Sequence, residues 1–381
     1  MRVLVVLSQP PLPEGGAPGR VAIGLLRGLQ AHGLEVRALA ARQHFALAGD
    51  PPDDLPVEVV DVPPRGTRSR LTDLRRPGGQ LAAGPLGARV REEADWADLI
   101  HLEETETAWC DHGVDRPSLV HVHYRVRRDR PWGALWRREF RHVLDFHRAE
   151  RMAIRRHRFL VASSPLVAAE LLGASPAADV VLAPLALDPR LYSAASLNGP
   201  PTVGLIGTGT WPPTEAAGRR LVERVWPLVR RRAPEAKLLI AGRGWDRLSG
   251  FGGPGVTLLG EVESGAEFMR SLSLLLFPIE RGSGVKVKVL EAIASGLPVV
   301  TTPAGAEGIE PGGGVIVESS DEALAAAASQ LLDDPAERQA RGLAARTLFE
   351  RLYAPAPATA PLLELYERMA DSRRSASRSR R

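Results

Sequence analysis

The residues best placed to do chemistry lie in a glycine-rich segment between two apolar runs. The chain has only three lysines against 46 arginines, and two of them, Lys286 and Lys288, fall in this segment. The pattern predicts a strand that ends at Pro278, a glycine loop, a helix over about 285–294 and a second strand. Backbone N–H groups at a helix start, with ammonium groups beside them, form an anion site suited to a diphosphate.

Glu291 lies on the same predicted helix, where its carboxylate is a good acceptor for a diol. Lys286 and Lys288 point about 200° apart on a helix, so both cannot line one site. We expect one of them to neutralise a phosphate and the other, Lys286, to be a solvated neighbour. The alternative is a loop and helix that merely pack on the sheet, with both lysines solvated.

A second glycine loop, Gly207-Thr208-Gly209, also follows a predicted strand. It is not a dinucleotide-binding fingerprint, because Pro212 takes the place of the third glycine. Arg243, rather than an acidic residue, follows the next strand. The sequence therefore disfavours a nicotinamide enzyme, although these glycines still permit close approach of a ligand.

His123 ends a further predicted strand, in the run Val120-His-Val-His123. A histidine in this position either faces a substrate or is satisfied by the core and the backbone, and both interpretations stay open. Cys110 is expected to be a small buried residue.

Strand-like apolar runs alternate with helical patterns along the whole chain, as in βαβ units on parallel sheets. Two such series are separated by a segment of turn-forming residues, Leu197-Asn-Gly-Pro-Pro201. The predicted fold class is therefore α/β, with two Rossmann-like domains. The expected strands are 3–7, 36–41, 57–62, 99–102, 119–123 and 159–162, then 203–206, 237–241, 256–259, 274–277, 299–302 and 315–317. The expected helices are 20–33, 214–232, 285–294, 321–332, 335–353 and 361–370.

The two series predict an N-terminal domain over 1–197 and a C-terminal domain over 202–350. A C-terminal helix over 351–371 is expected to return to the first domain, and a Ser/Arg tail over 372–381 is expected to be disordered. The tail carries five arginines and no acid. Its charge of +5 exceeds the formal net charge of +4 for the whole chain. The remainder is close to neutral, so we expect no binding to nucleic acid.

The totals fit a globular protein of two domains with full cores. The chain has 381 residues, 44% of them hydrophobic and 25% charged, with one cysteine. A single cysteine allows no intramolecular disulfide and suits a reducing compartment. Neither a signal-peptide pattern nor an apolar run long enough to span a membrane is found, so a cytoplasmic protein is expected.

An arginine-rich stretch over 125–158 carries twelve arginines against four acids. Trp132, Trp136 and Phe140 recur within it at a spacing of four residues. Such a segment suits peripheral docking on the anionic inner face of a membrane. A solvated basic face with aromatic core anchors is the alternative.

Several of these motifs together resemble the nucleotide-sugar glycosyltransferases of family 4. The resemblance implies their GT-B fold, α/β with two Rossmann-like domains facing across a cleft. The segment from Pro278 to Thr302 fits Pro-x-x-x-Gly-Ser-Gly-x-x-x-Lys-x-Leu-Glu-Ala-x-Ala-x-Gly-x-Pro-Val-Val-x-Thr. The other similar stretches are 207–214, Trp226-Pro227, 234–242 and Gly305-Ala-Glu-Gly308, and more loosely Gly15-Gly16, 100–103, Val122-His123 and 161–164.

The resemblance implies a glycosyltransferase that moves a sugar from a nucleoside-diphosphate sugar to an acceptor hydroxyl with retention of configuration. It implies no metal and no further cofactor, and an acceptor that is a glycan, a lipid-linked glycan or a small molecule. The implied catalytic residues are His123, Lys288 and Glu280. The implied donor-binding residues are Gly15, Gly16, Gly207, Thr208, Arg243, Gly282, Ser283, Gly284, Val285, Lys286 and Glu291.

In the family, a glutamate at the position of Glu291 holds the ribose hydroxyls, and a cation at the position of Lys288 binds the diphosphate. A histidine at the position of His123 faces the transferred sugar. Ser283 stands where the family's paired-glutamate motif has its first glutamate, and Glu280 precedes that position by three residues. A GT-B sugar-nucleotide epimerase and a non-catalytic sugar-nucleotide-binding protein are the alternative functions.

Overall fold

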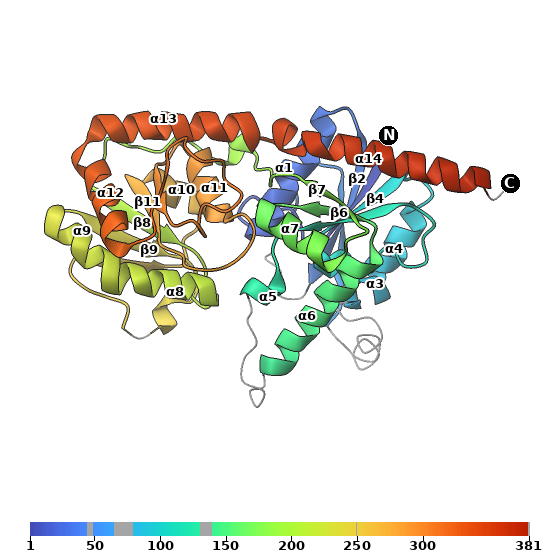
Figure 1. The fold of residues 1–381 in the computed structure, drawn as a ribbon, viewed down its shortest axis with the longest axis horizontal. Coiled ribbons are helices and arrows are strands. Elements are labelled where there is room, and N and C mark those ends of the chain that lie inside the picture. Colours follow the sequence, from blue (N-terminus) through green and yellow to red (C-terminus); the bar gives the residue numbers. More distant parts are fainter. Residues whose placement is uncertain (44–48, 65–78, 130–138, 249, 380–381) are drawn as a thin grey trace. The chain divides into compact units, whose positions relative to one another are not determined.

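A computed structural model of the protein describes residues 1–43, 49–64, 79–129, 139–248 and 250–379. Contacts divide the chain into two compact units. The first unit comprises Met1–Asp188 together with Pro355–Arg381, and the second comprises Pro189–Ala354. Both units alternate strands with helices (Figure 1).

The first unit is built on a parallel sheet of seven strands. The strands are β1 (Arg2–Leu7), β2 (Glu35–Gln43), β3 (Val57–Val62), β4 (Leu99–Glu103), β5 (Ser118–Val122), β6 (Phe159–Ala162) and β7 (Asp179–Leu182). Their order is β3-β2-β1-β4-β5-β6-β7. From β1 the chain adds β2 and β3 on one side of β1, and it then adds β4 on the other side. The carboxyl ends of β1 and β4 therefore form a topological switch point.

The strand β7 is the one strand of this sheet that the sequence pattern did not predict. It pairs only with β6, at the edge of the sheet, and none of its four residues is fully buried. An edge strand this short leaves little apolar pattern in the sequence. The central strands, in contrast, are buried almost throughout, which accounts for their continuous apolar runs.

The helices of the first unit include one from the far end of the chain. They are α1 (Ala17–Ala31), α3 (Gln80–Ala83), α4 (Pro85–Glu93), α5 (Val126–Asp129), α6 (Glu139–Arg156), α7 (Pro165–Ala174) and α14 (Pro355–Ser379). Helix α14 packs against α1. A side chain at Gly28 would meet the Pro355 carbonyl oxygen at 2.3 Å, so this approach requires glycine.

Helix α14 is longer at both ends than the expected helix over 361–370. It includes the Ser/Arg tail as far as Ser379, where disorder was expected, and residues 380–381 lie outside the described residues. Arginine and alanine are good helix formers, and they extend a helix that packing has already nucleated. Helices α3 and α4 follow residues 65–78, which lie outside the described residues.

The second unit repeats the arrangement with six parallel strands. They are β8 (Thr202–Ile206), β9 (Lys237–Ala241), β10 (Val256–Gly260), β11 (Leu274–Phe277), β12 (Val299–Thr301) and β13 (Val315–Val317). The order β10-β9-β8-β11-β12-β13 puts the switch point of this sheet at the carboxyl ends of β8 and β11.

The predicted helix over 214–232 is interrupted in the structure. The helices of this unit are α8 (Pro212–Arg220), α9 (Trp226–Arg232), α10 (Gly265–Arg270), α11 (Val287–Ala294), α12 (Asp321–Asp333) and α13 (Pro335–Leu352). A π-helical turn over Leu221–Val225 separates α8 from α9. Pro227 explains it, because proline lacks an N–H and its ring clashes with the carbonyl four residues earlier. Among the described helices, none combines the length and apolar character needed to cross a membrane.

Candidate functional site

Both glycine loops of the second unit lie at its switch point. Gly207 follows β8, and the loop over 278–286 follows β11, the neighbouring strand. The carboxyl ends of parallel strands meet at one edge of a sheet, which is where open α/β sheets bind ligands. The Gly209 N–H donates to the carbonyl of Arg243 at 2.9 Å, so the loop after β9 joins the same edge.

The loop before α11 has a backbone that only glycine adopts readily. Gly282 and Gly284 have φ angles of 127° and 71°. Ser283, between them, is buried with 3% of its surface exposed. Lys286 is the N-cap of α11, and its side chain does not cap the helix. The first turn of α11 therefore presents backbone N–H groups and the positive end of the helix dipole to the loop.

A carboxylate from a later loop already contacts this glycine loop. Glu307 Oε1 accepts the Gly284 N–H at 2.9 Å. Lys286 Nζ lies 3.8 Å from Glu307 Oε2 and donates to the Gly284 carbonyl at 2.7 Å. The expectation that Lys286 is solvated was wrong, because these contacts leave only 12% of its side chain exposed. The loop amide thus binds an anionic oxygen, as a phosphate site requires.

Lys288 and Glu291 form an ion pair across one turn of α11. Lys288 Nζ lies 2.9 Å from Glu291 Oε2, and 24% of the lysine side chain is exposed. The Glu291 residue is 2% exposed, and its other oxygen accepts a hydrogen bond from the Tyr192 hydroxyl at 3.2 Å. Lys286 and Lys288 therefore have different partners, one on the loop and one on the helix.

Two of the predicted site residues have partners outside this group. The Glu280 carboxylate is half exposed and lies 3.6 Å from the guanidinium groups of both Arg220 and Arg224. Arg243 pairs with Glu261 at 2.7 Å, and both side chains are largely exposed. The structure brings together Gly282, Ser283, Gly284, Val285, Lys286, Lys288 and Glu291 in one loop and helix start, with Gly207 and Thr208 on the neighbouring loop.

In the first unit, Gly15 and Gly16 lie in the turn between β1 and α1. The Gly15 N–H donates to the Leu12 carbonyl at 3.0 Å, and Gly16 is the N-cap of α1. The Arg20 guanidinium donates to the Gly15 carbonyl, which fixes this turn at the switch point of the sheet. A side chain at Gly15 would meet the Leu12 carbonyl oxygen at 2.9 Å, so the turn itself requires glycine there.

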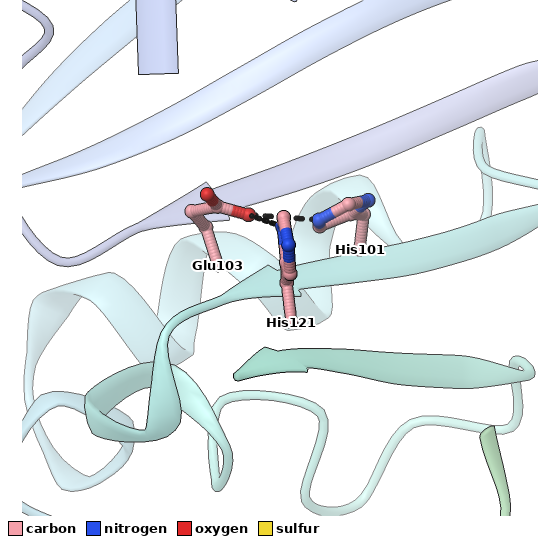
Figure 2. Close-up of side chains that lie close together, drawn as sticks. All are labelled: His101, Glu103 and His121. Atoms are coloured by element: carbon pink, nitrogen blue, oxygen red, sulfur yellow. Dashed lines mark hydrogen bonds and ion pairs between the residues drawn. The ribbon is translucent and has the colours of Figure 1, made fainter. Parts of the chain in front are cut away.

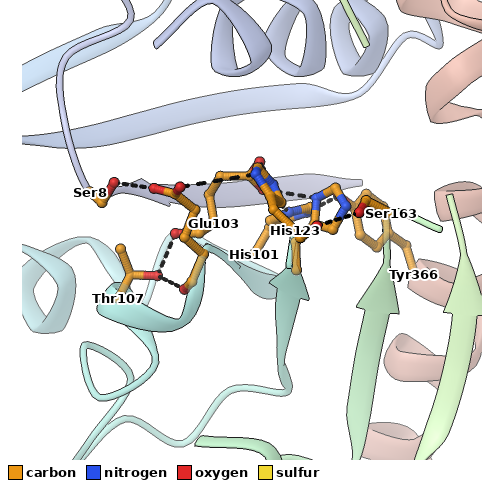
Figure 3. A network of polar contacts seen from close by, with 9 residues as sticks. Ser8, His101, Glu103, Thr107, His123, Ser163 and Tyr366 are labelled. Atoms are coloured by element: carbon orange, nitrogen blue, oxygen red, sulfur yellow. Dashed lines mark hydrogen bonds and ion pairs between the residues drawn. The ribbon is translucent and has the colours of Figure 1, made fainter. Parts of the chain in front are cut away.

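Three polar side chains follow neighbouring strands at the same switch point. Ser8 follows β1, Glu104 follows β4 and His123 follows β5. The Ser8 hydroxyl donates to the Glu104 carboxylate, and His123 Nδ1 lies 4.0 Å from Glu104 Oε1. Figure 3 shows Ser8 at one end of a polar network and Tyr366 at the other, with His123 between them.

The centre of this network is Glu103, the last residue of β4. One of its oxygens accepts hydrogen bonds from His101 at 2.9 Å and His121 at 3.1 Å, as Figure 2 shows. Its other oxygen accepts from His123 Nε2 at 2.7 Å. The Tyr366 hydroxyl of α14 donates to His101 Nδ1 at 2.6 Å. A carboxylate only accepts, so these bonds fix which nitrogen of each histidine carries a proton.

The electrostatics separate the two adjacent carboxylates. Burial alone would raise the pKa of Glu103, but His121 and His123 lower it well below its usual value. Burial, with the charge of Glu106, raises the pKa of Glu104 to about 7, although His123 and Ser8 oppose the rise. Glu103 is therefore a permanent anion, while Glu104 takes up and releases a proton near neutrality.

The histidines also differ from one another. Burial lowers the pKa of His121 to about 4, although the nearby Glu103 acts to raise it. Burial would lower the pKa of His123 too, but Glu103 and Glu104 raise it above its usual value. His101, Glu103 and His121 offer ligand atoms within 4.8 Å of one another. Since Glu103 accepts a hydrogen bond from each histidine, we describe the group as a hydrogen-bonded cluster.

Comparison with known families identifies the second unit. Residues 200–334 match the family model for group 1 glycosyl transferases. This match lies within the second unit. A mannosyltransferase of Corynebacterium glutamicum, named as GDP-mannose-dependent and acting on monoacylated alpha-(1-6)-phosphatidylinositol monomannoside, is 33% identical over 162 residues. That match covers 36% of this chain and 42% of the relative.

Solved structures extend the likeness to the fold of the whole chain. A sucrose-phosphate synthase from Thermosynechococcus elongatus has a TM-score of 0.70 at 17% identity, covering 98% of this chain and all of the other. Anabaena Alr3699/HepE, solved with UDP and glucose, has a TM-score of 0.65 at 16% identity, covering 96% of this chain and 99% of the other. The fold of two parallel α/β sheets is therefore the GT-B type, as predicted.

The sequence pattern did not indicate four side chains that the fold brings to these sites. Glu307 and Tyr192 reach the glycine loop and Glu291 from distant segments. Glu103 and Glu104 end the predicted strand over 99–102, and the position of a carboxylate at a strand end was the available signal.

The arginine-rich stretch is only partly described. Residues 130–138, with Trp132 and Trp136, lie outside the described residues. Arg127 and Arg128 pair with Glu170 at 2.9 and 2.8 Å, so part of the basic charge is matched within the first unit.

Proposed function

We propose that the protein transfers a hexosyl group from a nucleoside-diphosphate sugar to an acceptor hydroxyl. The observation that carries this proposal is the arrangement after β11, where a glycine loop, the start of α11 and the Lys288–Glu291 pair lie at the switch point of the second sheet. The match of residues 200–334 to the family model for group 1 glycosyl transferases supports it.

In this proposal the second unit binds the donor through opposite charges. The carboxylate of Glu291, oriented by Tyr192, accepts hydrogen bonds from the ribose hydroxyls. The loop amides, the first turn of α11 and the Lys288 ammonium hold the diphosphate. When the anomeric C–O bond breaks, its electron pair leaves with the diphosphate, and these preorganised positive groups stabilise the added charge. Retention of configuration is the outcome that the family resemblance implies.

The nature of donor and acceptor is also a proposal. The corynebacterial relative is named for GDP-mannose and a phosphatidylinositol mannoside, and the Anabaena structure holds UDP and glucose. We infer a UDP- or GDP-linked hexose as donor and a lipid-linked or other glycan as acceptor. A lipid-linked acceptor is consistent with a cytoplasmic protein that contacts the membrane peripherally through the stretch over 125–158.

A panel of donors tests the proposal. Purified protein is first titrated calorimetrically with UDP and GDP, then incubated with UDP-glucose, UDP-N-acetylglucosamine and GDP-mannose. Release of nucleoside diphosphate with transfer of labelled sugar to octyl glycosides or water is the expected result. Conversion of the donor to its epimer without release would show an epimerase, and binding without any turnover would show a non-catalytic binding protein.

A further inference from the structure

A carboxylate that has no role in the proposed function lies against the glycine loop of the second unit. Glu307 belongs to the turn after β12, and β12 is the neighbour of β11 in the sheet. Its Oε1 accepts the N–H of Gly284 at 2.9 Å, and its Oε2 lies 3.8 Å from Lys286 Nζ. The carboxyl ends of neighbouring parallel strands share one edge, so Glu307 reaches the same switch point as the loop.

The turn that carries Glu307 is fixed on both sides of that residue. Before it, the Thr302 hydroxyl donates to the carbonyl of Ile279, at the start of the glycine loop. After it, the Glu310 N–H donates to the hydroxyl of Tyr353, at the end of α13, at 2.8 Å. Contacts of this kind hold a side chain in one place before a ligand arrives. The Glu307 carboxylate is therefore preorganised beside the loop.

The charge of Glu307 is matched, so a carboxylate beside a phosphate site does not simply repel the phosphate. The ammonium of Lys286 lies within ion-pair distance of it, and 12% of each side chain is exposed. A carboxylate also offers about four lone-pair sites on its two oxygens. It can therefore accept from the Gly284 N–H and from the hydroxyls of a ligand at the same time.

The polar groups along the loop and α11 follow the order of the parts of a sugar nucleotide. Glu307 contacts the loop, and Glu291 lies in the second turn of the helix, about 6 Å along its axis from the first residue. Between them along the chain are the amides of the first turn and the ammonium of Lys288. A sugar nucleotide has hydroxyls at both ends and a diphosphate in the middle. Two carboxylates flanking a cationic centre are complementary to it, with Glu291 at the ribose and Glu307 at the sugar.

We propose that Glu307 binds the hexose of the donor and that its carboxylate accepts hydrogen bonds from the sugar hydroxyls. This inference rests on the proposed function, because it takes the nucleoside diphosphate to be bound by Glu291 and the loop. An ionised carboxylate makes stronger hydrogen bonds to hydroxyls than a neutral amide does. The hexose-linked donor therefore gains affinity from Glu307, whereas the nucleoside diphosphate alone does not.

Calorimetry of Glu307→Gln tests the assignment. UDP and GDP are the sugar-free ligands, and UDP-glucose, UDP-N-acetylglucosamine and GDP-mannose are the donors. Glutamine has nearly the same shape, and its amide oxygen still accepts the Gly284 N–H, so the loop is kept. Affinity for the donor that the unaltered protein binds should fall at least about tenfold, while affinity for the matching UDP or GDP should stay within about twofold. The unchanged UDP or GDP affinity also shows that the variant is folded.

Glu310→Gln is the matched control. Glu310 follows on the same segment, its side chain is half exposed, and it pairs with Arg351, so neither affinity should change. Equal losses of affinity for donor and nucleoside diphosphate in Glu307→Gln would make Glu307 only a support of the loop, and equal gains would make it only a charge that opposes the diphosphate. Either result, or an unchanged donor affinity, would overturn the sugar contact, as would an unaltered protein that binds UDP or GDP but none of the donors. An unaltered protein that binds no nucleotide at all would refute the proposed function, and this inference with it.

Discussion

The stability of the first unit should depend on pH through Glu104, and Glu104→Gln should remove that dependence. The pKa of this carboxyl is about 7 in the folded protein, against an ordinary value of 4.5. Between these values the folded state binds more protons than the unfolded state, so stability falls as pH rises. The cost of holding the Glu104 carboxylate charged in the folded protein is absent below pH 4.5 and complete above pH 7. At about 1.4 kcal/mol per pKa unit, it amounts to roughly 3 kcal/mol.

The assay compares Glu104→Gln with the unaltered protein in urea denaturation at a series of pH values from about 4.5 to 8. Hydrogen exchange of the β4 amides assigns the change to the first unit. Glutamine has no charge to bury, so the variant should gain stability relative to the unaltered protein as pH rises, reaching roughly 3 kcal/mol at pH 8. A difference that is constant with pH, or that grows toward acid, would refute the reasoning.

Glu104→Gly separates the effect of charge from that of backbone strain. Glycine removes the carboxylate as glutamine does, and it also adopts a φ of 66° without a steric penalty. Relative to Glu104→Gln, it should therefore differ by an amount that does not change with pH, with strain relief contributing about 1–3 kcal/mol. A pH-dependent difference between the two variants would show that another group titrates in this region.

Four further outcomes are expected of the proposed mechanism. Lys288→Ala should lower kcat about a hundredfold in a folded protein, because one cation no longer faces the leaving phosphate, and near-normal kcat would contradict this. Glu291→Gln should weaken nucleoside-diphosphate binding severalfold by calorimetry, whereas unchanged affinity would leave Glu291 a structural partner of Lys288. His123→Ala should reduce transfer and keep nucleotide affinity within about twofold, and a loss of affinity would make it a structural histidine. Activity should survive excess EDTA. Loss of activity in EDTA, with recovery when Mg²⁺ or Mn²⁺ is added, would overturn the role given to the loop amides.

The sequence by itself determined the elements that depend on neighbouring residues. Buried parallel strands are continuous apolar runs, so all twelve predicted strands overlap strands of the two sheets. The loop before α11 was predictable because glycine, lysine and glutamate follow one another within a few residues, and a helix start orients its own amides.

Only the tertiary structure decided which distant side chains complete these sites. Glu307 reaches Gly284 across 23 residues, Tyr192 reaches Glu291 across 99, and Tyr366 reaches His101 across 265. Such contacts depend on strand order and on which residues of the returning helix α14 face the first sheet, which local patterns do not encode.

The same reason explains why the pKa values of Glu103 and Glu104 shift in opposite directions. In sequence, Glu103 and Glu104 are two equivalent carboxylates at a strand end. In the fold, three histidines, one on β4, one on β5 and one directly after β5, surround Glu103. Burial and the charge of Glu106 act instead on Glu104. Charge in a protein interior is set by the neighbours that the fold supplies, and the two glutamates therefore acquire opposite behaviour toward protons.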